Sequence, residues 1–455
     1  MPIPAEFARA HRAQFEAELS DLLRIPSIST LAANRGDVQA AARWLTDYLG
    51  KIGLASELIS TQGHPLVYAE WTGAPGRPTV LCYGHYDVQP VDPLDLWTTP
   101  PFEPVVRAGS LFARGAADDK GQFFTIIAAI RAYLETKTPL PANIKLLIEG
   151  EEESGGASIE AFVRDHGDRL RADAALVLDA GMFAPGIPAV TLGLRGIVMT
   201  EVEVTGAARD LHSGQYGGVA PNPFVALAEI IAGLKDPHGR ILIPQFYDRV
   251  VPPHPDEEAG WDRLPFDEEA FLHAEIGAPA LVGESGYTAL ERMWARPTLD
   301  VHGMPGGFTG EGSKTVIPAK GSAKISMRLV PEQDPAEVFR HFEAHVRHLT
   351  PRGTRVHIRR YHGAAPVVMS PALPAIAAAK RALTDAFGRD AVFVRTGGSI
   401  PIVADFIGRL GLPTVITGWT LPDANLHSPD EKLDLEHFHT GIQAVIRFFE
   451  EMGAA

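Results

Sequence analysis

The fold of this chain is most directly predicted from residues 78–90, which have the sequence PTVLCYGHYDVQP. The first six of these residues form a short apolar run, which is typical of a strand buried on both faces of a parallel sheet. Similar runs follow at 143–149, NIKLLIE, and at 174–179, AALVLD. Between the first two runs, residues 120–135 carry apolar side chains at helical spacing. Strands that alternate with helices predict an α/β domain, with a mostly parallel sheet covered by helices on both faces.

The middle of the chain has a different pattern. Residues 196–205 and 321–330 alternate between apolar and polar side chains, as strands with one exposed face do. The order of strands and helices resembles the split βαβ sandwich, a ferredoxin-like α+β arrangement. Residues 236–295 interrupt this order without a clear period, so we expect them to form an insertion. The expected elements are strands at 196–205, 297–302, 321–330 and 354–361, and helices at 222–235 and 335–349.

After residue 370 the α/β pattern resumes. A chain of 455 residues is too long for one compact core, so at least two domains are expected. We predict an α/β domain formed by residues 1–191 and 365–455, with an α+β domain at 192–364 inserted into it. The other expected elements of the α/β domain are helices at 37–50, 371–387 and 434–451 and a strand at 413–417.

Composition argues against several classes of partner and location. The formal charge of -15, without a basic patch, argues against binding to nucleic acid or to an anionic membrane. The apolar runs are too short to cross a bilayer, and the first residues do not resemble a secretory signal. Cys82 is the only cysteine, which is compatible with a reducing cytoplasm. Because Cys82 lies within an apolar run, we expect a buried structural thiol rather than a nucleophile.

Histidine and carboxylate side chains follow the predicted strands and precede one helix. The carboxyl ends of parallel strands meet at one edge of a sheet, so these side chains are expected to lie close together. Imidazoles combined with carboxylates suit Zn²⁺ or a similar ion, and two ions need a bridging anion that a carboxylate can supply. The candidates are His85, Asp87, Asp118, Asp119, Glu151, Glu152, Glu153, Asp179 and His427.

Each candidate ligand also has an ordinary interpretation. A lone histidine is more often a surface residue, an acidic run is usually solvated, and an aspartate before a helix is by default an N-cap. The joint placement of these residues at the ends of several strands favours the metal site, because a solvated surface has no reason to produce it.

Seven segments of the chain resemble the zinc-dependent exopeptidases and deacylases. This is the family of acetylornithine deacetylase, succinyl-diaminopimelate desuccinylase and glutamate carboxypeptidase. The resemblance extends from about residue 20 to residue 450, and it is closest to the cytosolic nonspecific dipeptidase and carnosinase branch. The segments are GHYDVQP (84–90), RGAADDKG (114–121), EGEEESGG (149–156), DLHSGQYGG (210–218), GSKTVIPAKG (312–321), SMRLVP (326–331) and GGSIP (397–401).

The resemblance implies a dinuclear metal centre. His85 and Asp179 would bind one ion, Glu153 and His427 would bind the other, and Asp118 would bridge them. The implied ions are Zn²⁺, with Mn²⁺ or Co²⁺ as alternatives. Nearby, the resemblance implies that Asp87 orients a ligating imidazole and that Glu152 is the general base.

Residues outside the metal centre also acquire implied roles. His212, in the inserted domain, would reach the active site of the other protomer of a homodimer, which makes this domain a lid and dimerisation domain. Arg328 would hold the carboxylate of the substrate, and Gly397, Gly398 and Ser399 would offer backbone N–H groups to the same end. His302 lies in a matching stretch without an assigned task.

The implied reaction is hydrolysis of an amide bond by a metal-bridging hydroxide. The substrate would be a dipeptide or similar small peptide with a free C-terminal carboxylate. Deacylation of N-acyl amino acids by the same site is the alternative, which the insertion at 236–295 and the segment SMRLVP disfavour. A catalytically silent metal-binding protein is a third possibility, which the intact Glu152 argues against. Ala113 and Ala180 depart from residues common in the family, but neither change removes a ligand.

Overall fold

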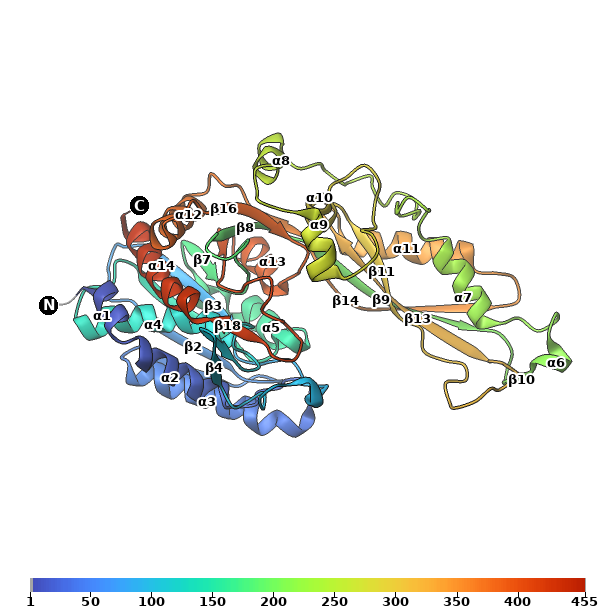
Figure 1. The fold of residues 1–455 in the computed structure, drawn as a ribbon, viewed down its shortest axis with the longest axis horizontal. Coiled ribbons are helices and arrows are strands. Elements are labelled where there is room, and N and C mark those ends of the chain that lie inside the picture. The colour runs from blue at the N-terminus through green and yellow to red at the C-terminus, as the bar shows by residue number, and fades with distance from the viewer. Residues whose placement is uncertain (1–2, 455) are drawn as a thin grey trace. The chain divides into compact units, whose positions relative to one another are not determined.

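Two structural units are formed by residues 3–454, the part of the chain that this computed structural model describes (Figure 1). Of the described residues, the first unit contains 3–192, 369–394 and 401–454. The second unit contains Gly193–Val368 and Arg395–Ile400. The segment Gly193–Val368 therefore interrupts the first unit. A second, short segment, Arg395–Ile400, interrupts it again and also belongs to the second unit.

The boundaries of the units differ in part from the expected ones. The first falls after Leu192, one residue later than expected, and the next falls after Val368, four residues later. Arg395–Ile400, expected in the α/β domain, belongs to the second unit. Hydrogen bonds explain this correction: the amide of Arg195 donates to the carbonyl oxygen of Thr396 at 3.3 Å, and Arg328 donates to Ser399 at 2.9 Å.

A six-stranded sheet lies at the centre of the first unit, in the order β1-β2-β6-β3-β7-β17. The pairs β6–β3, β3–β7 and β7–β17 are parallel, whereas β1–β2 and β2–β6 are antiparallel. The prediction of a mostly parallel sheet is confirmed, with an antiparallel edge that the sequence did not reveal. The strands are β1 (Ala55–Ile59), β2 (Leu66–Trp71), β3 (Thr79–His85), β6 (Asn143–Glu149), β7 (Ala174–Val177) and β17 (Thr414–Ile416).

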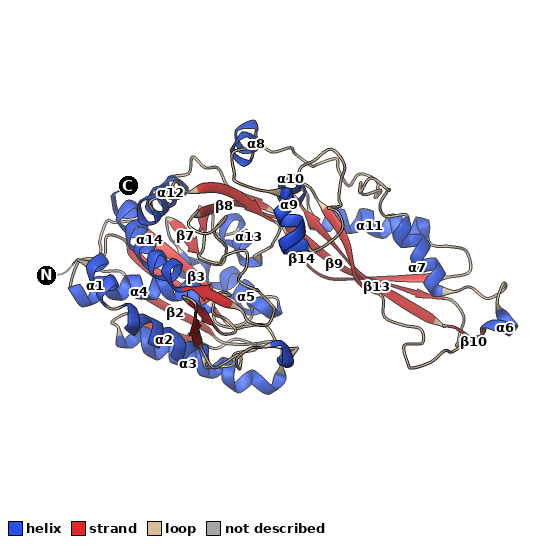
Figure 2. Ribbon diagram, viewed as in Figure 1, coloured by secondary structure: helices blue, strands red, loops and turns tan. Residues whose placement is uncertain are grey.

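Helices cover both faces of this sheet (Figure 2). On β3, the ring of Tyr83 packs against Phe406 of α13 with their centroids 5.9 Å apart. The next residue, Gly84, faces the opposite side, where an added Cβ would lie 2.4 Å from Cβ of Phe123 in α4. Glycine at this position therefore lets α4 approach the sheet closely. The helices of the first unit are α1 (Pro4–Ala10), α2 (Arg12–Leu23), α3 (Arg35–Lys51), α4 (Lys120–Thr136), α5 (Ala157–His166), α12 (Pro374–Phe387), α13 (Pro401–Gly408) and α14 (Leu435–Ala454).

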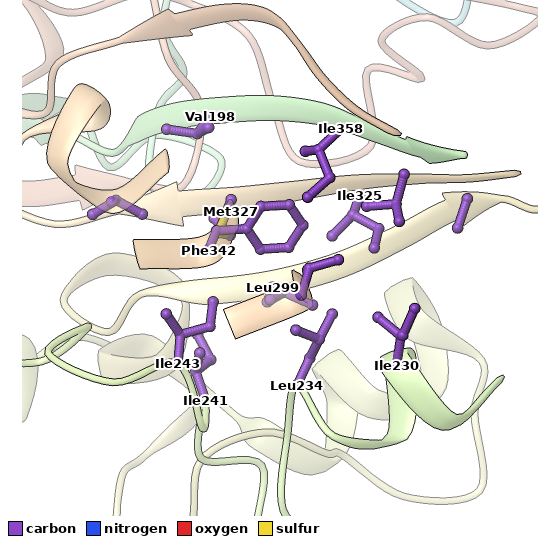
Figure 3. Close-up of a cluster of buried hydrophobic side chains, with 14 of the residues drawn as sticks. Val198, Ile230, Leu234, Ile241, Ile243, Leu299, Ile325, Met327, Phe342 and Ile358 are labelled. Carbon is purple, nitrogen blue, oxygen red and sulfur yellow. The ribbon is translucent and has the colours of Figure 1, made fainter. Parts of the chain in front are cut away.

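The second unit contains an antiparallel sheet in the order β11-β13-β9-β14, as the split βαβ arrangement requires. Alternate residues of β9, including Val198 and Val202, are buried, so the predicted alternation is confirmed. They pack with Met327 of β13 and Phe342 of α11 (Figure 3). The elements are β9 (Gly196–Thr205), α7 (Pro223–Ala232), β11 (Thr298–Gly303), β13 (Lys320–Leu329), α11 (Pro335–Leu349) and β14 (Arg355–Ala364).

The insertion in the second unit consists of short helices with a small core of their own. Trp261, Leu290 and Ala295 form this core, and Trp294 packs against it. Helices of four to seven residues are too short to display a helical period, which explains why the sequence showed none. The helices are α8 (Pro255–Trp261), α9 (Glu268–Phe271) and α10 (Ala289–Trp294).

Several further short elements complete the described chain. Within residues 3–454, no helix has the length and apolar character needed to cross a bilayer. Cys82 is buried and free, as expected. The remaining elements are β4 (Val105–Arg107), β5 (Ser110–Phe112), β8 (Ala189–Leu194), β10 (Leu211–His212), α6 (Ser213–Tyr216), β12 (Val316–Ile317), β15 (Val367–Val368), β16 (Val392–Thr396) and β18 (Lys432–Asp434).

Candidate metal centre and active site

The predicted metal ligands converge where strands of the first unit end. His85 is the last residue of β3 and lies opposite Glu149, the last residue of β6, in the parallel register. Asp179 follows β7, and His427 lies in the loop after β17. Because the carboxyl ends of parallel strands share one edge, these side chains meet there. Asp118 reaches the same place from the segment that precedes α4.

Asp118 joins two groups of potential ligands. Its Oδ1 lies 3.0 Å from Nε2 of His85, and its Oδ2 lies 2.9 Å from Nε2 of His427. Oδ1 of Asp179 is 4.0 Å from the His85 nitrogen, and Oε1 of Glu153 is 3.4 Å from that of His427. In each group, His85–Asp118–Asp179 and Asp118–Glu153–His427, the ligand atoms lie within 4.8 Å of one another. The structure thus brings together all five predicted ligands.

These donors fit two divalent cations. Each group offers one imidazole and two carboxylates, a donor set that suits Zn²⁺ and similar ions. Burial and the negative charge of Asp118 together raise the pKa of Asp179 well above its usual range. Carboxylates gathered out of water destabilise one another's charged forms, and bound cations would remove that repulsion.

Asp87 supports both the histidine and the glutamates of the centre. Its backbone oxygen lies 3.1 Å from Nδ1 of His85, and its carboxylate Oδ1 lies 3.4 Å from the same nitrogen. The carboxylate also accepts hydrogen bonds from the backbone amides of Glu152, at 3.2 Å, and Glu153, at 3.1 Å. The contacts with Glu152 and Glu153 are not predicted from the sequence, because they depend on how the turn after β6 is oriented toward the residues that follow β3.

The three consecutive glutamates have different surroundings. The Glu151 carboxylate is buried and accepts hydrogen bonds from the amides of His64 and Ser158. The Glu153 carboxylate faces His427 in the metal centre. Among residues 3–454, no hydrogen bond to the Glu152 carboxylate is found, and this side chain lines a small cavity. Burial and nearby carboxylates raise the pKa of Glu152 to about 8, although His85 opposes the shift.

Two supporting interactions are absent from the sequence-based prediction. Glu431 is fully buried and accepts hydrogen bonds from Arg114 at 2.7 Å and from the amides of Gly115, Ala117 and Asp118 at 2.9–3.1 Å. Gln89 donates to Oε2 of Glu153 at 2.6 Å. Gln89 belongs to one of the quoted segments, GHYDVQP, and Glu431 lies in the same loop as His427. In the sequence, the closeness of Gln89 and Glu431 to predicted ligands is the feature that could have identified them.

The loop that carries His427 has an unusual backbone. His427 has φ 57° and Asn425 has φ 56°, in the left-handed region that most side chains avoid. The Asn425 side chain donates to the carbonyl oxygen of Asp430 at 3.2 Å, which closes the loop. Residues held in this region are concentrated at functional sites, so the conformation of His427 agrees with a role as a ligand.

The residues predicted to bind a carboxylate lie together in the second unit. Nη1 of Arg328 donates to Oγ of Ser399 at 2.9 Å, and Nε of Arg195 donates to the carbonyl oxygen of Gly397 at 3.3 Å. The Ser399 hydroxyl also donates to the backbone oxygen of Arg195. Burial and the charge of Arg328 lower the pKa of Arg195 to about 10. Two neighbouring guanidinium groups favour an anion, and sequence reasoning missed Arg195.

His212 and Arg328 lie at opposite ends of the sheet of the second unit. Lys320 pairs with Thr205 at one end of the β13–β9 ladder, and Arg328 pairs with Ile197 near the other. His212 belongs to β10, which follows the Thr205 end, and its exposed ring accepts a hydrogen bond from Gly214. The eight residue steps from 320 to 328 span roughly 27 Å.

His302, to which the sequence assigns no task, makes a contact within the second unit. It lies on β11, and its Nε2 is 2.7 Å from the hydroxyl of Ser326 on β13. The contact joins two neighbouring strands, which is a sufficient structural reason for a histidine at this position.

Comparison with known proteins points to a single family. Residues 81–451 match the sequence profile described as peptidase family M20/M25/M40. The chain is 32% identical to the Cys-Gly metallodipeptidase dug1 of Schizosaccharomyces pombe, over 97% of this chain and 96% of that protein. It is 32% identical to the human Beta-Ala-His dipeptidase, over 85% of this chain and 77% of that protein.

A solved structure shows the same similarity in three dimensions. The dipeptidase Dug1p of Saccharomyces cerevisiae superposes with a TM-score of 0.88 and 29% sequence identity. The match covers 99% of this chain and 98% of that one.

Proposed function

The chain belongs to peptidase family M20/M25/M40, and from this premise we propose that it is a metal-dependent dipeptidase. The observation that carries the proposal is the pair of ligand groups that share Asp118, in a chain similar over nearly its whole length to a Cys-Gly metallodipeptidase. The proposed substrates are dipeptides or similar small peptides with a free C-terminal carboxylate. Dipeptidases recur among the relatives, so deacylation of N-acyl amino acids is the less favoured alternative.

The metal ions would be held entirely by the first unit. His85, Asp118 and Asp179 would bind one ion, and Asp118, Glu153 and His427 would bind the other, with Zn²⁺ as the proposed metal and Mn²⁺ or Co²⁺ as alternatives. When bound, such a pair polarises a carbonyl group and makes a water molecule more acidic.

Glu152 is the proposed general base. It would accept the proton of the attacking water and return it to the leaving amine. Its position supports this assignment, because Glu151 is occupied by backbone amides and Glu153 faces His427. Asp87 would hold the base in place through the amides of Glu152 and Glu153.

Arg328 is the proposed partner of the substrate's carboxylate. A guanidinium group can donate two parallel hydrogen bonds to a carboxylate, and its positive charge strengthens both. Arg328 is oriented by Ser399, and the nearby Arg195 adds a second positive charge. The backbone amides of Gly397, Gly398 and Ser399 would complete this subsite.

A homodimer is the proposed form of the enzyme, with His212 serving the other protomer's site. The length of the β13 ladder supports this: Lys320 and Arg328 lie roughly 27 Å apart, and His212 follows the Lys320 end, so His212 and Arg328 of one second unit are too far apart to hold the same dipeptide. The inserted α+β domain is accordingly proposed to act as lid and dimerisation domain. The cytoplasm is the proposed location, supported by the single, buried Cys82.

The test of the proposed function is a substrate panel. Enzyme freed of metal with a chelator and reloaded with Zn²⁺, Mn²⁺ or Co²⁺ is assayed on dipeptides and on N-acyl amino acids. We expect hydrolysis of dipeptides by reloaded enzyme and none by the chelated form. Cleavage of N-acyl amino acids alone would reverse the order of the two proposals. Full metal content without hydrolysis of either class would indicate a catalytically silent metal-binding protein.

A further inference from the structure

A small cavity adjoins the proposed general base in the first unit. Its volume is about 30 Å³, enough for a water molecule or an ammonium group. Glu152 lines one side, and Glu149, the last residue of β6, lines another. The exposed residues Glu160 of α5 and Pro401 of α13 also line it, so the cavity reaches the surface between these two helices.

Glu149 points an unpaired oxygen atom into this cavity. The residue is 1% exposed, and its Oε1 accepts a hydrogen bond from the hydroxyl of Tyr83 at 2.7 Å. Its buried Oε2 has no hydrogen-bond partner among residues 3–454. A Cβ added to Gly156, another lining residue, would lie 3.4 Å from this Oε2. Oε2 therefore faces space that Gly156 leaves open, and a buried acceptor without a donor is costly.

Every polar side chain that lines the cavity is an acceptor in its ionised form. These side chains are the carboxylates of Glu149, Glu152, Glu160 and Asp405. The amides of Gly155 and Gly156 already donate to the backbone oxygens of Glu152 and Glu151, at 3.1 Å and 2.7 Å. Arg409 lies outside the lining and is paired with Asp405 and, at 4.0 Å, with Glu160, so Glu149 and Glu152 are the lining carboxylates without a basic partner there. The lining therefore suits an occupant that donates hydrogen bonds and carries positive charge.

We propose that this cavity binds the ammonium group of the substrate's amino-terminal residue, with Glu149 as its buried acceptor. This inference rests on the proposed dipeptidase function and names a feature of its substrate. In a dipeptide the ammonium group is attached to the carbon next to the scissile carbonyl group. Glu152, which would act at that carbonyl, lines the same cavity. The cavity therefore selects peptides with a free amino terminus, whereas an N-acyl amino acid has no group to fill it.

The experiment compares two substrates that differ only in the amino group, alanyl-glycine and propionyl-glycine. We expect metal-loaded wild-type enzyme to prefer alanyl-glycine by about 10- to 100-fold in kcat/KM, the usual contribution of hydrogen bonds to a charged group. Glu149→Gln should remove most of this preference by raising KM for alanyl-glycine, with kcat little changed, because the ammonium group is bound equally in ground and transition states. Its kcat/KM for propionyl-glycine should change by less than about twofold.

Two further variants separate charge, space and general damage. Gly156→Ala keeps every carboxylate but places a methyl group 3.4 Å from Oε2 of Glu149, at a residue with φ 63° that alanine adopts only with strain; where thermal unfolding shows that the fold is retained, it should cause the same selective loss. Asp165→Asn changes an exposed carboxylate of α5 away from the cavity and should alter neither substrate's kinetics. Metal content and thermal unfolding are measured for each variant, to verify that the centre and the fold are retained.

The inference fails if the wild-type enzyme cleaves both substrates equally well, because the cavity would then hold only water. It also fails if Glu149→Gln slows both substrates equally, since that pattern indicates a structural role. A requirement for added ammonium or potassium chloride with both substrates would assign the cavity to a free cation and overturn the substrate assignment. If wild-type enzyme with full metal content cleaves neither compound nor any other dipeptide, the proposed function itself is wrong.

Discussion

Three identical residues in a row, Glu151 to Glu153, are placed in three different environments by one short turn. Just before and within the turn at Glu152–Ser154, the backbone changes direction from one residue to the next. Glu151 therefore meets two backbone amides, Glu152 lines the cavity, and Glu153 faces His427. Asp87 holds the turn through two amides. At the scale of single residues, the role of each glutamate therefore depends on where its side chain points rather than on its residue type.

Replacement of Glu152 by glutamine is expected to lower kcat by about 100- to 10,000-fold, the usual contribution of a general base. Metal content should be unchanged, because the ligand atoms belong to other residues. Steady-state kinetics and elemental analysis of the purified variant measure both quantities. Loss of metal from Glu152→Gln would contradict the assignment and make Glu152 a ligand.

Glu151→Gln is the matched control for this variant. The change removes a charged acceptor from two buried amides, so it should cost about 1.5–3 kcal/mol of unfolding free energy. The folded protein should retain kcat within a few-fold of wild type. Urea unfolding and kinetics together distinguish the two neighbours.

Glu431 offers a second prediction at this scale. Glu431→Gln weakens the buried pair with Arg114 and disturbs the amide contacts that position Asp118. Changes next to metal ligands commonly weaken metal binding by about 10- to 100-fold, and we expect the same here. Competition with a fluorescent chelator measures the change. Glu436→Gln, at an exposed pair with Arg12, is the control, and equal affinities in the two variants would contradict the prediction.

At the scale of elements, α2, α3 and α4 are joined by a polar network at their contact. Glu18 of α2 accepts hydrogen bonds from Tyr48 of α3 at 2.6 Å and from Arg131 of α4 at 2.6 and 2.7 Å. Burial alone would raise the pKa of Glu18, but these bonds outweigh it and hold the pKa below its ordinary value of 4.5. The network therefore stabilises the packing of three helices only while Glu18 is ionised.

The pH dependence of stability tests this network. A carboxylate with a lowered pKa in the folded state contributes its full stabilisation above about pH 4.5, and the contribution is lost as the pH falls through the lower folded-state value. Glu18→Gln should therefore lower the unfolding free energy by about 1.5–3 kcal/mol at pH 7, and the loss should become smaller as the pH is lowered below about 4.5. Urea unfolding at pH 7 and at a series of pH values below 4.5 measures this change.

Glu135 supplies the control for this measurement. It pairs with Arg131 at 3.5 Å, but half of its side chain is exposed, so Glu135→Gln should have little effect at either pH. A destabilisation by Glu18→Gln that does not change with pH would contradict the prediction.

At the scale of the whole molecule, the predicted site residues are divided between the two units. The first unit holds every proposed metal ligand and Glu152, whereas the second holds Arg328, Ser399 and His212. Within the second unit, Lys320 and Arg328 lie roughly 27 Å apart along β13, and His212 follows the Lys320 end of this ladder. If both residues serve one site, as proposed, that site needs two copies of the second unit.

Complementation of two inactive variants tests the shared site. Purified heterodimers of a His212→Ala chain and a Glu152→Ala chain contain one site with both residues intact, so we expect about half of the wild-type activity. Each variant alone should be nearly inactive, and the exposed His238→Ala should remain active as a control. Proven heterodimers without activity would show that His212 does not serve a partner's site.

Much of the fold could be predicted because periodicity is a local property. The helix predicted at 335–349 has these bounds, and the strand predicted at 143–149 is β6. The antiparallel strands β1, at the edge of the sheet, and β2, next to it, were missed. On β1 the residues are exposed or half-buried and leave no clear apolar pattern, whereas the buried run at the start of β2 was overlooked. The return of Arg395–Ile400 to the second unit was also missed, because it depends on hydrogen bonds to Arg195 and Arg328.

The sequence by itself determined that histidines and carboxylates would gather at the ends of parallel strands, because the direction of the strands places those ends on one edge. Only the tertiary structure decided which glutamate is occupied by backbone amides and which faces His427. It also decided that Glu149 turns an unpaired oxygen into a cavity. The physical reason is that a side chain's charge and partners depend on groups distant along the chain, as Arg114 and Glu431 show across 317 residues.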